Sequence, residues 1–164
     1  MNLHKDISNT IISYLNEFDI NIIKNIIDDD ACNYAIKCGH LSLVKLMQNS
    51  GYDSLESICE NAAGNGHLDV LIWARENGWE WNEYISQSAA SNGHLDILKW
   101  LYANGCQLNH QICSGAAKNG HLNILRWAVE NGCQCDERVC AFAARCGHLD
   151  MLQWLRANDC PWDE

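Results

Sequence analysis

The stretch that decides the fold is Ala89-Ala90-Ser91-Asn92-Gly93-His94-Leu95-Asp96-Ile97-Leu98-Lys99-Trp100-Leu101. Its Gly-His-Leu tripeptide occurs five times, and each occurrence lies 27 residues after the one before it. The five tripeptides begin at Gly39, Gly66, Gly93, Gly120 and Gly147. A fixed period of this length predicts a stack of small structural units that pack against their neighbours.

Each 27-residue unit carries the signals of two short antiparallel helices, one before and one after the Gly-His-Leu tripeptide. Around Gly93 we expect a first helix from Asn82 to Asn92 with Asn82 as its N-cap, and a second helix from Leu95 to Ala103. The equivalent N-caps in the next two units are Asn109 and Asp136. Left-handed helix stops are expected at Asn77-Gly78, Asn104-Gly105, Asn131-Gly132, Ser50-Gly51 and Asn158-Asp159.

Two sets of equivalent positions predict how the units pack. An alanine pair such as Ala89-Ala90 would let first helices approach their neighbours closely. Bulk between units would come from Leu95, Leu98, Trp100 and Leu101, and truncating Trp100 to Ala is expected to cost about 3–5 kcal/mol. The aromatic positions equivalent to Trp100 are Leu46, Trp73, Trp127 and Trp154.

The segment from Ala89 to Leu101 resembles the core pattern of the ankyrin repeat, and the resemblance extends over roughly residues 30 to 164. The unit has 27 residues, against about 33 in the standard repeat. The usual Thr-Pro-Leu-His opening of the first helix is also absent. The missing residues fall where ordinary ankyrin repeats project a β-hairpin finger. This shortened variety is similar to the ankyrin arrays of giant DNA viruses and some protists.

The resemblance implies an all-α, ankyrin-like α-solenoid of stacked antiparallel helix pairs, with β-hairpin fingers shortened or absent. Its five repeats would occupy about residues 30–56, 57–83, 84–110, 111–137 and 138–164. Residues 1–29 are expected to form an N-terminal helical cap. Within them, Asp6-Ile7, Ile11-Ile12-Ser13-Tyr14-Leu15 and Asp19-Ile20 are similar to the opening helices of an F-box, which recruits a ubiquitin-ligase core.

Composition restricts the partners and the compartment. With 11 Lys and Arg against 21 Asp and Glu, the formal charge is -10, which argues against nucleic acids and anionic membranes and favours a basic or mixed-charge protein surface. The Ile-rich segment from Ile7 to Ile27 is interrupted by polar residues, so it predicts neither a signal peptide nor a membrane span. Ten cysteines without a secretion signal indicate free thiols in a reducing, cytoplasmic location, the host cytoplasm in the case of a viral protein.

No catalytic motif is present: the sequence has no nucleophile elbow, P-loop, His-Glu-x-x-His or dinucleotide fingerprint. We therefore expect no enzyme activity and no cofactor. Cys133, Cys135 and Cys140, near His110 or His148, raise the question of a zinc site. Nine of the ten cysteines share three repeat positions, and only Cys135 stands alone. Packing explains these nine cysteines. The Gly-His-Leu histidines would satisfy backbone groups at the start of the second helix. We therefore expect no metal site.

Positions that differ between repeats on an exposed helix face are candidates for recognition. On the first helices this variable face has mixed charge and includes aromatic side chains suited to binding hot spots. A merely solvated face is the alternative. The predicted partner-binding residues are Tyr34, Lys37, Glu60, Tyr84, Gln87, Ser91, Gln111, Ser114, Lys118, Arg138, Phe142 and Arg145.

The predicted function is therefore that of a non-enzymatic scaffold that binds another protein through this face. The alternative is a substrate-recognition adaptor of a ubiquitin ligase, recruited through the F-box-like N-terminus. The segment Trp162-Asp163-Glu164 matches Trp81-Asn82-Glu83, the start of a first helix. An exposed apolar C-terminal end could thus also drive self-association.

Overall fold

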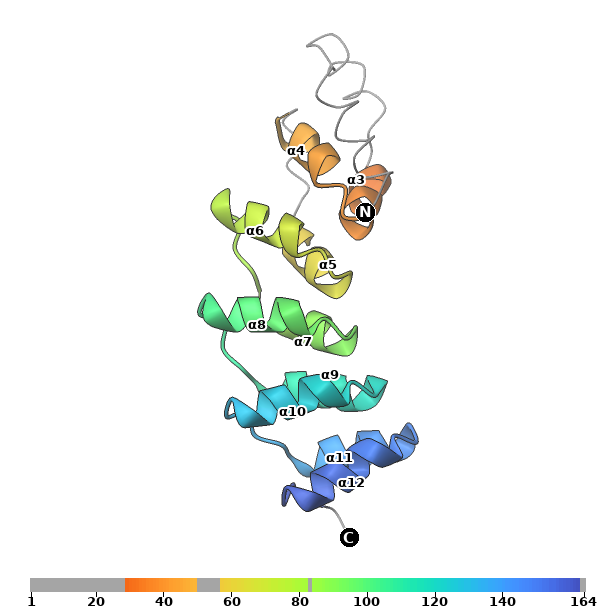
Figure 1. The fold of residues 1–164 in the computed structure, drawn as a ribbon. Coiled ribbons are helices and arrows are strands. Elements are labelled where there is room, and N and C mark those ends of the chain that lie inside the picture. The colour runs from red at the N-terminus through yellow and green to blue at the C-terminus, as the bar shows by residue number, and fades with distance from the viewer. Residues whose placement is uncertain (1–28, 50–56, 83, 163–164) are drawn as a thin grey trace. The chain divides into compact units, whose positions relative to one another are not determined.

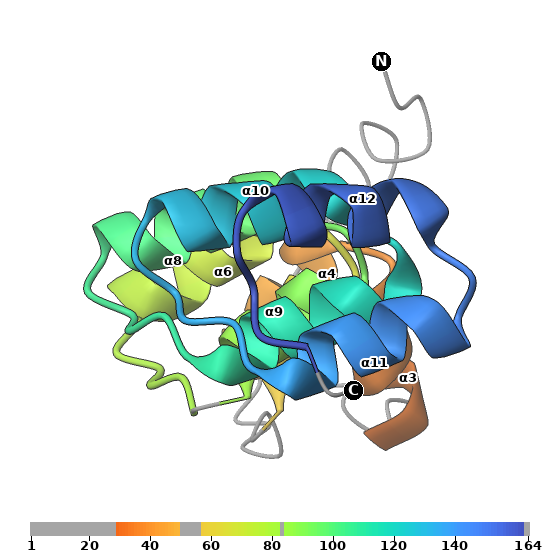
Figure 2. The same cartoon turned by 90° about the horizontal axis from the view of Figure 1, so that it is seen from below.

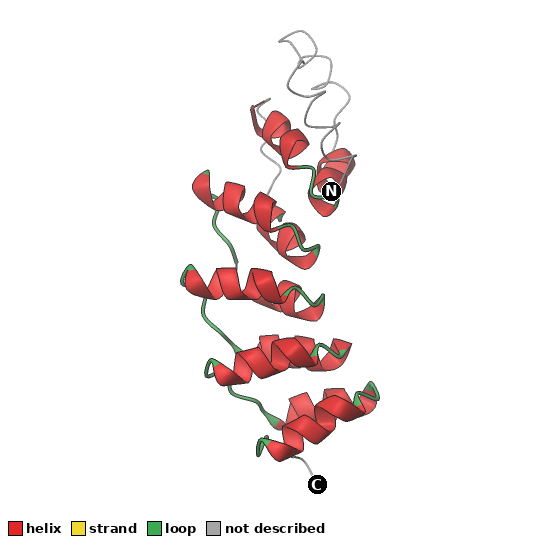
Figure 3. Cartoon of the chain, in the orientation of Figure 1, coloured by secondary structure: helices red, strands yellow, loops and turns green. Residues whose placement is uncertain are grey.

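The computed structural model describes residues 29–49, 57–82 and 84–162. These residues form ten α-helices and no strand (Figure 3). Paired helices without β-hairpin fingers are therefore confirmed for the described part of the chain. Residues 1–28, which carry the expected cap and the F-box-like segment, and the predicted stop at Ser50-Gly51 lie outside the described residues. None of the described helices is long and apolar enough to cross a membrane.

The internal contacts divide the chain into two compact units, Met1–Glu80 and Trp81–Glu164. In the first unit, each Gly-His-Leu tripeptide joins a first helix to a second helix, and the two first helices, α3 and α5, pack against each other. The described helices of this unit are α3 (Asp29–Lys37), α4 (Leu41–Asn49), α5 (Ile58–Gly64) and α6 (Leu68–Glu76) (Figure 1).

The second unit contains three helix pairs in two layers. Its first helices pack side by side, α7 against α9 and α9 against α11. Its second helices form the other layer, which Figure 2 shows for α10 and α12 above α9 and α11. The six helices are α7 (Ile85–Ser91), α8 (Leu95–Ala103), α9 (His110–Asn119), α10 (Leu122–Glu130), α11 (Glu137–Arg145) and α12 (Leu149–Ala157).

Most of the predicted helix boundaries are confirmed. Helix α8 spans Leu95–Ala103 as expected, and Asn109 and Asp136 cap α9 and α11 by accepting backbone N–H groups. The described stops have positive φ at Gly78, Gly105, Gly132 and Asp159.

The predicted start of α7 is wrong, because this helix begins at Ile85 rather than directly after Asn82. The Asn82 carboxamide still accepts the N–H of Tyr84 at 3.0 Å, as Asn109 does for Gln111. However, the bond from the Ile85 N–H to the Asn82 carbonyl is stretched to 3.4 Å. The local cap interaction therefore forms without starting the helix at once.

The core of α8 differs from the expectation at Leu95 and Trp100, because Leu95 too is partly exposed. Ile97, Leu98 and Leu101 are at most 1 % exposed, whereas Trp100 is partly exposed and lies edge-on to Trp81 with ring centroids 5.8 Å apart. The aliphatic side chains, not the tryptophan, therefore fill the interior. The alanine pairs at Ala89-Ala90 and Ala116-Ala117 are fully buried, as expected.

Candidate partner-binding surface

The Gly-His-Leu histidines link consecutive repeats and hold the ends of the first helices in place. Three of these rings, those of His67, His121 and His148, reach a backbone carbonyl in the last turn of the preceding first helix, where carbonyl groups lack intrahelical partners. A carbonyl only accepts, so Nε2 carries the proton. The described bonds join His67 Nε2 to Lys37 O (2.7 Å), His121 Nε2 to Ser91 O (3.1 Å) and His148 Nε2 to Lys118 O (3.4 Å).

The prediction that these histidines serve backbone groups at the start of the second helix is therefore wrong. Their partners lie 30 residues back along the chain, in the neighbouring repeat. The sequence shows that the imidazole needs a polar partner, but only the stacking of the repeats decides which carbonyl comes within reach.

The histidine ring also packs on the glycine of the preceding Gly-His-Leu tripeptide. Gly120 has φ +78°, and a Cβ atom there would lie 2.7 Å from His148 Cε1. Gly147 has φ +74°, but a Cβ atom there would meet nothing within 4 Å. The repeat thus uses this glycine both for its backbone conformation and for the close approach of the next histidine.

All twelve predicted partner-binding residues lie at the surface. Nine of them belong to the second unit, where the side-by-side packing of α7, α9 and α11 brings them onto one helical layer. Tyr34, Lys37 and Glu60 lie on α3 and α5 of the first unit. The exposed side chains are Tyr34, Lys37, Tyr84, Lys118, Arg138 and Arg145, and the partly exposed ones are Glu60, Gln87, Ser91, Gln111, Ser114 and Phe142.

Two of these residues also have structural contacts that the sequence did not predict. The Arg138 guanidinium binds the carboxylate of Asp136, with Nε 2.9 Å from Oδ2, and thereby lowers the pKa of the carboxyl that caps α11. Ser91 faces the neighbouring helix, because a Cβ atom at Gly115 would lie 2.6 Å from its Oγ. Ser91 is therefore also part of the α7–α9 contact.

The charge on this face differs in sign from that of the whole chain. Lys118 and Arg145 are exposed in the last turns of α9 and α11. Cations at these positions interact favourably with the negative ends of the helices, so they have a structural role as well. Together they give the face two cations that could bind carboxylates of a partner.

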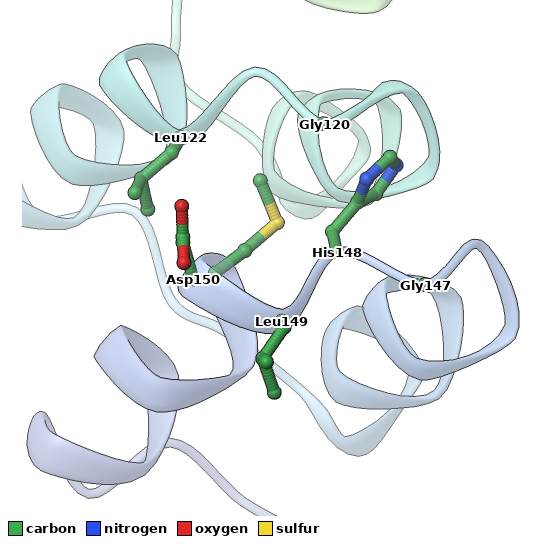
Figure 4. A pocket seen from close by; sticks show the side chains of 7 residues that line it. Gly120, Leu122, Gly147, His148, Leu149 and Asp150 are labelled. Atoms are coloured by element: carbon green, nitrogen blue, oxygen red, sulfur yellow. The ribbon is translucent and has the colours of Figure 1, made fainter.

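A pocket of about 360 Å³ lies where α10 and α12 begin, and the sequence analysis did not identify it. Figure 4 shows its lining, with His148 on the side of Gly120 and Asp150 on the side of Leu122. The imidazole and the carboxylate are thus on different sides of the pocket. Leu149 is 63 % exposed at its rim, whereas the equivalent Leu122 is only partly exposed, and this contrast depends on stacking rather than on sequence.

The cysteines of the second unit pair across their repeat positions. Ser86 Oγ lies 3.0 Å from Cys106 Sγ, and Cys113 Sγ lies 3.1 Å from Cys133 Sγ. Both pairs are separated by 20 residues and join the start of a first helix to the turn after a second helix. Among the described residues, no group of three or more His, Cys, Asp or Glu side chains is placed to hold a metal ion.

Family models for ankyrin repeats match the chain in two places. A model of three repeat copies matches residues 86–163, and a model of many copies matches residues 59–101. The matched residues include the three helix pairs of the second unit and the α5–α6 pair of the first. No curated protein is similar enough to the chain to be matched.

Proposed function

Because this chain belongs to the ankyrin-repeat family, whose repeats are generally protein–protein interaction modules, we propose that it is a non-enzymatic scaffold that binds another protein through the variable face of its first helices. The observation that carries this proposal is the contrast between the two sides of each first helix. The inner side is nearly uniform and fully buried, as at Ile85, Ile112 and Val139. The residues directly before these on the outer side differ from repeat to repeat and reach solvent: Tyr84, Gln111 and Arg138.

The chemistry of the face favours a particular kind of partner segment. Tyr84 is 48 % exposed, and exposed aromatic side chains are frequent hot spots in protein interfaces. Lys118 and Arg145 add positive charge at the other ends of the first helices. A protein segment with one apolar side chain and one or more carboxylates would complement both features.

The repeat itself supplies substitutions that test this face with little risk to the fold. Tyr84→Gln and Arg138→Gln copy Gln111, and Lys118→Ser and Arg145→Ser copy Ser91, which occupy the equivalent positions. We expect the fourfold variant to keep the far-UV circular dichroism of the wild type and to lose only a little in melting temperature, because the charge interactions of Lys118, Arg138 and Arg145 are exposed at the surface and contribute little to stability. Its affinity for the partner, identified by affinity capture and mass spectrometry, should fall about tenfold or more, because hot-spot losses exceed about 2 kcal/mol.

A matched control removes charges from the opposite layer. Lys99 and Arg156 are exposed on α8 and α12, and Lys99→Gln and Arg156→Gln copy Gln153 and Gln48 at the equivalent positions. This variant should bind the partner as the wild type does. Equal affinity of the face variant and the wild type, or equal losses in both variants, would refute the proposed surface.

The same capture experiment tests the adaptor role proposed for residues 1–28. Recovery of the ubiquitin-ligase subunit that F-boxes bind, lost when residues 1–28 are deleted, would support that role. If the subunit is absent while a partner of the helical face is retained, the adaptor role is refuted and the scaffold role stands.

Self-association is a further proposed interaction of the fifth repeat. Ala144 is exposed, whereas the equivalent Ala117 and Ala90 are buried, and Leu149 of the same repeat is 63 % exposed. Leu149→Lys should therefore lower the association constant in sedimentation equilibrium. A wild-type chain that stays monomeric at high concentration would exclude this interaction.

A further inference from the structure

One cysteine of the second unit does not belong to the repeating pairs. Cys135 occupies the position that holds Trp81, Leu108 and Trp162 in other repeats, so the repeat does not require a thiol there. Its thiol interacts with the neighbouring Cys113 and Cys160, and these interactions shift its pKa. We define the thiol cluster as Cys113, Cys133, Cys135 and Cys160.

Within the cluster, the four thiols differ in access to solvent. Cys113 is 0 % exposed and donates to Cys133, whose own thiol donates to the Asn109 carbonyl at 3.0 Å. Cys135 and Cys160 instead line a pocket of about 260 Å³ on the protein surface. This volume is several times that of a water molecule, about 30 Å³, so a small polar oxidant can enter the pocket beside the partly exposed Cys135 and the largely buried Cys160.

The four thiols also differ in where the proton resides. The neighbouring thiols of Cys113 and Cys160 lower the pKa of Cys135 to about 7, against the opposing effects of burial and of Asp136. Burial, the nearby Cys135 and the hydrogen bond to it raise the pKa of Cys160 to about 12. The hydrogen bond from Cys113 lowers the pKa of Cys133 as well, but Cys133 is only 6 % exposed and does not line this pocket. Cys135 is thus the pocket-lining thiol whose pKa is lowered, and the thiolate is the form of cysteine that reacts with oxidants.

We propose that Cys135 is a peroxide-reactive thiol that forms a reversible disulfide with Cys160. The Cys135 thiolate forms when its thiol releases a proton to solvent. It attacks one oxygen of hydrogen peroxide, the O–O bond breaks, and the departing hydroxide takes up a proton equivalent to the one released, which leaves a sulfenic acid on Cys135 and one water molecule. Cys160 then gives its proton to solvent, and its sulfur attacks the Cys135 sulfur. The S–O bond breaks, and the departing hydroxide takes up that second proton and leaves as water. Two thiols lose two electrons in total, and the peroxide is reduced to two water molecules.

Cys160 is the partner rather than Cys113 because it lines the same pocket as Cys135, so its proton can leave directly to solvent. The resulting bond would enclose α11 and α12, because both helices lie between residues 135 and 160. Oxidation would therefore tie the end of the fourth repeat, just before α11, to the end of the fifth repeat. The fifth repeat carries Arg138, Phe142 and Arg145 of the proposed partner-binding face, but the disulfide does not depend on that face being functional.

The test uses the full chain in a background without its exposed thiols. Cys38 and Cys146 are exposed, and Cys38→Asn and Cys146→Asn copy Asn65, Asn92 and Asn119 at the equivalent position. The reduced protein is treated with less than one equivalent of hydrogen peroxide, its free thiols are blocked, and it is digested without reduction for mass spectrometry. We expect a linked peptide pair containing Cys135 and Cys160 to appear first and to disappear after dithiothreitol.

Two variants serve as controls. Cys135→Leu copies Leu108, so it removes the thiol and keeps an apolar side chain that the repeat already uses. The rate at which this variant consumes peroxide should be at least about threefold lower than that of the wild type. The reason is that an activated thiolate reacts roughly threefold faster than an ordinary cysteine at neutral pH. In Cys160→Ser, the sulfenic acid on Cys135 has no thiol at residue 160 to react with, so it should be trapped by dimedone. This result does not depend on whether Cys135→Leu folds.

Three results would overturn the proposal. The first is that Cys135 stays reduced while other cysteines are oxidised, and the second is that the first disulfide excludes Cys135 or Cys160. The third is unchanged peroxide consumption by a folded Cys135→Leu variant. Loss of partner binding by the surface variant with normal disulfide formation, or the reverse, would separate this site from the proposed scaffold function.

Discussion

Gly120 and Gly147 form a matched pair that measures how much the histidine–glycine contact stabilises the stack. Both begin a Gly-His-Leu tripeptide, and their φ angles are similar, +78° and +74°. They differ in what a side chain would meet: a Cβ atom on Gly120 would lie 2.7 Å from His148 Cε1, whereas one on Gly147 meets nothing within 4 Å. The perturbation is Gly→Ala at each position in turn.

The expected costs follow from these two environments. Alanine in the left-handed region costs about 1–2 kcal/mol at either position. At Gly120 the imidazole must also move, which adds about 1–3 kcal/mol for overpacking, and the long hydrogen bond from His148 to the Lys118 carbonyl, 3.4 Å, is weakened. Gly120→Ala should therefore lower the free energy of unfolding by about 2–5 kcal/mol and Gly147→Ala by only about 1–2 kcal/mol.

Urea denaturation followed by far-UV circular dichroism measures both costs, as shifts of the midpoint at constant slope. Adding His148→Ala to each variant completes a double-mutant cycle. The coupling with Gly120→Ala should be about 1–3 kcal/mol, because removing the ring removes the clash. The coupling with Gly147→Ala should be close to zero. Equal costs for the two glycine variants, or no coupling at Gly120, would show that the ring contact in the structure does not constrain this glycine.

Three further predictions concern capping, core packing and thiol reactivity. The pKa of Asp136 is lowered in the folded chain, so its carboxylate stabilises the fold fully above its ordinary pKa of about 3.9, and this stabilisation is lost as the pH falls further. The difference in free energy of unfolding between wild type and Asp136→Asn should therefore shrink below about pH 4 in acid titrations. A difference that stays constant with pH would contradict the capping role. Leu98→Ala should lower the free energy of unfolding, measured by urea denaturation, by about 2–5 kcal/mol. This loss should exceed that of Trp100→Ala, because Leu98 is fully buried and Trp100 is not. A larger loss for Trp100→Ala would contradict this account of the core. Since the pKa of Cys135 is lowered to about 7, its oxidation by peroxide should reach half its maximal rate near that pH, and a midpoint near the ordinary value of about 8.5 would show that the thiol is not activated.

Much of the fold could be predicted because its signals are local and recur. The all-α, ankyrin-like class is confirmed by the helices and by the family models, and Leu95–Ala103 was predicted to the residue. Features that depend on contacts between repeats were not predicted. The partners of the histidines lie 30 residues away, and the partial exposure of Trp100 depends on how tightly its aliphatic neighbours pack.

The candidate surface could be predicted for the same reason, but its details could not. Comparing repeats identified a face whose residues all prove to be exposed or partly exposed. The contact of Ser91 with Gly115 and the interaction of Cys135 with Cys160 each join residues from different repeats. The odd repeat position of Cys135 was visible in the sequence, but its thiol neighbours became apparent only in the packed structure.

The histidine bonds explain how this face can vary while the scaffold stays constant. Their acceptors are the carbonyl oxygens of Lys37, Ser91 and Lys118, which belong to equivalent positions of the repeat. A backbone carbonyl is present whatever the side chain, so either a lysine or a serine at this position leaves the bond between repeats intact. The longer side chains at this position, Lys37, Lys118 and Arg145, are exposed, whereas the short Ser91 contacts the neighbouring helix. The repeat thus places its obligatory contacts on backbone atoms and on glycine, and leaves the outer side chains of the first helices available for binding a partner.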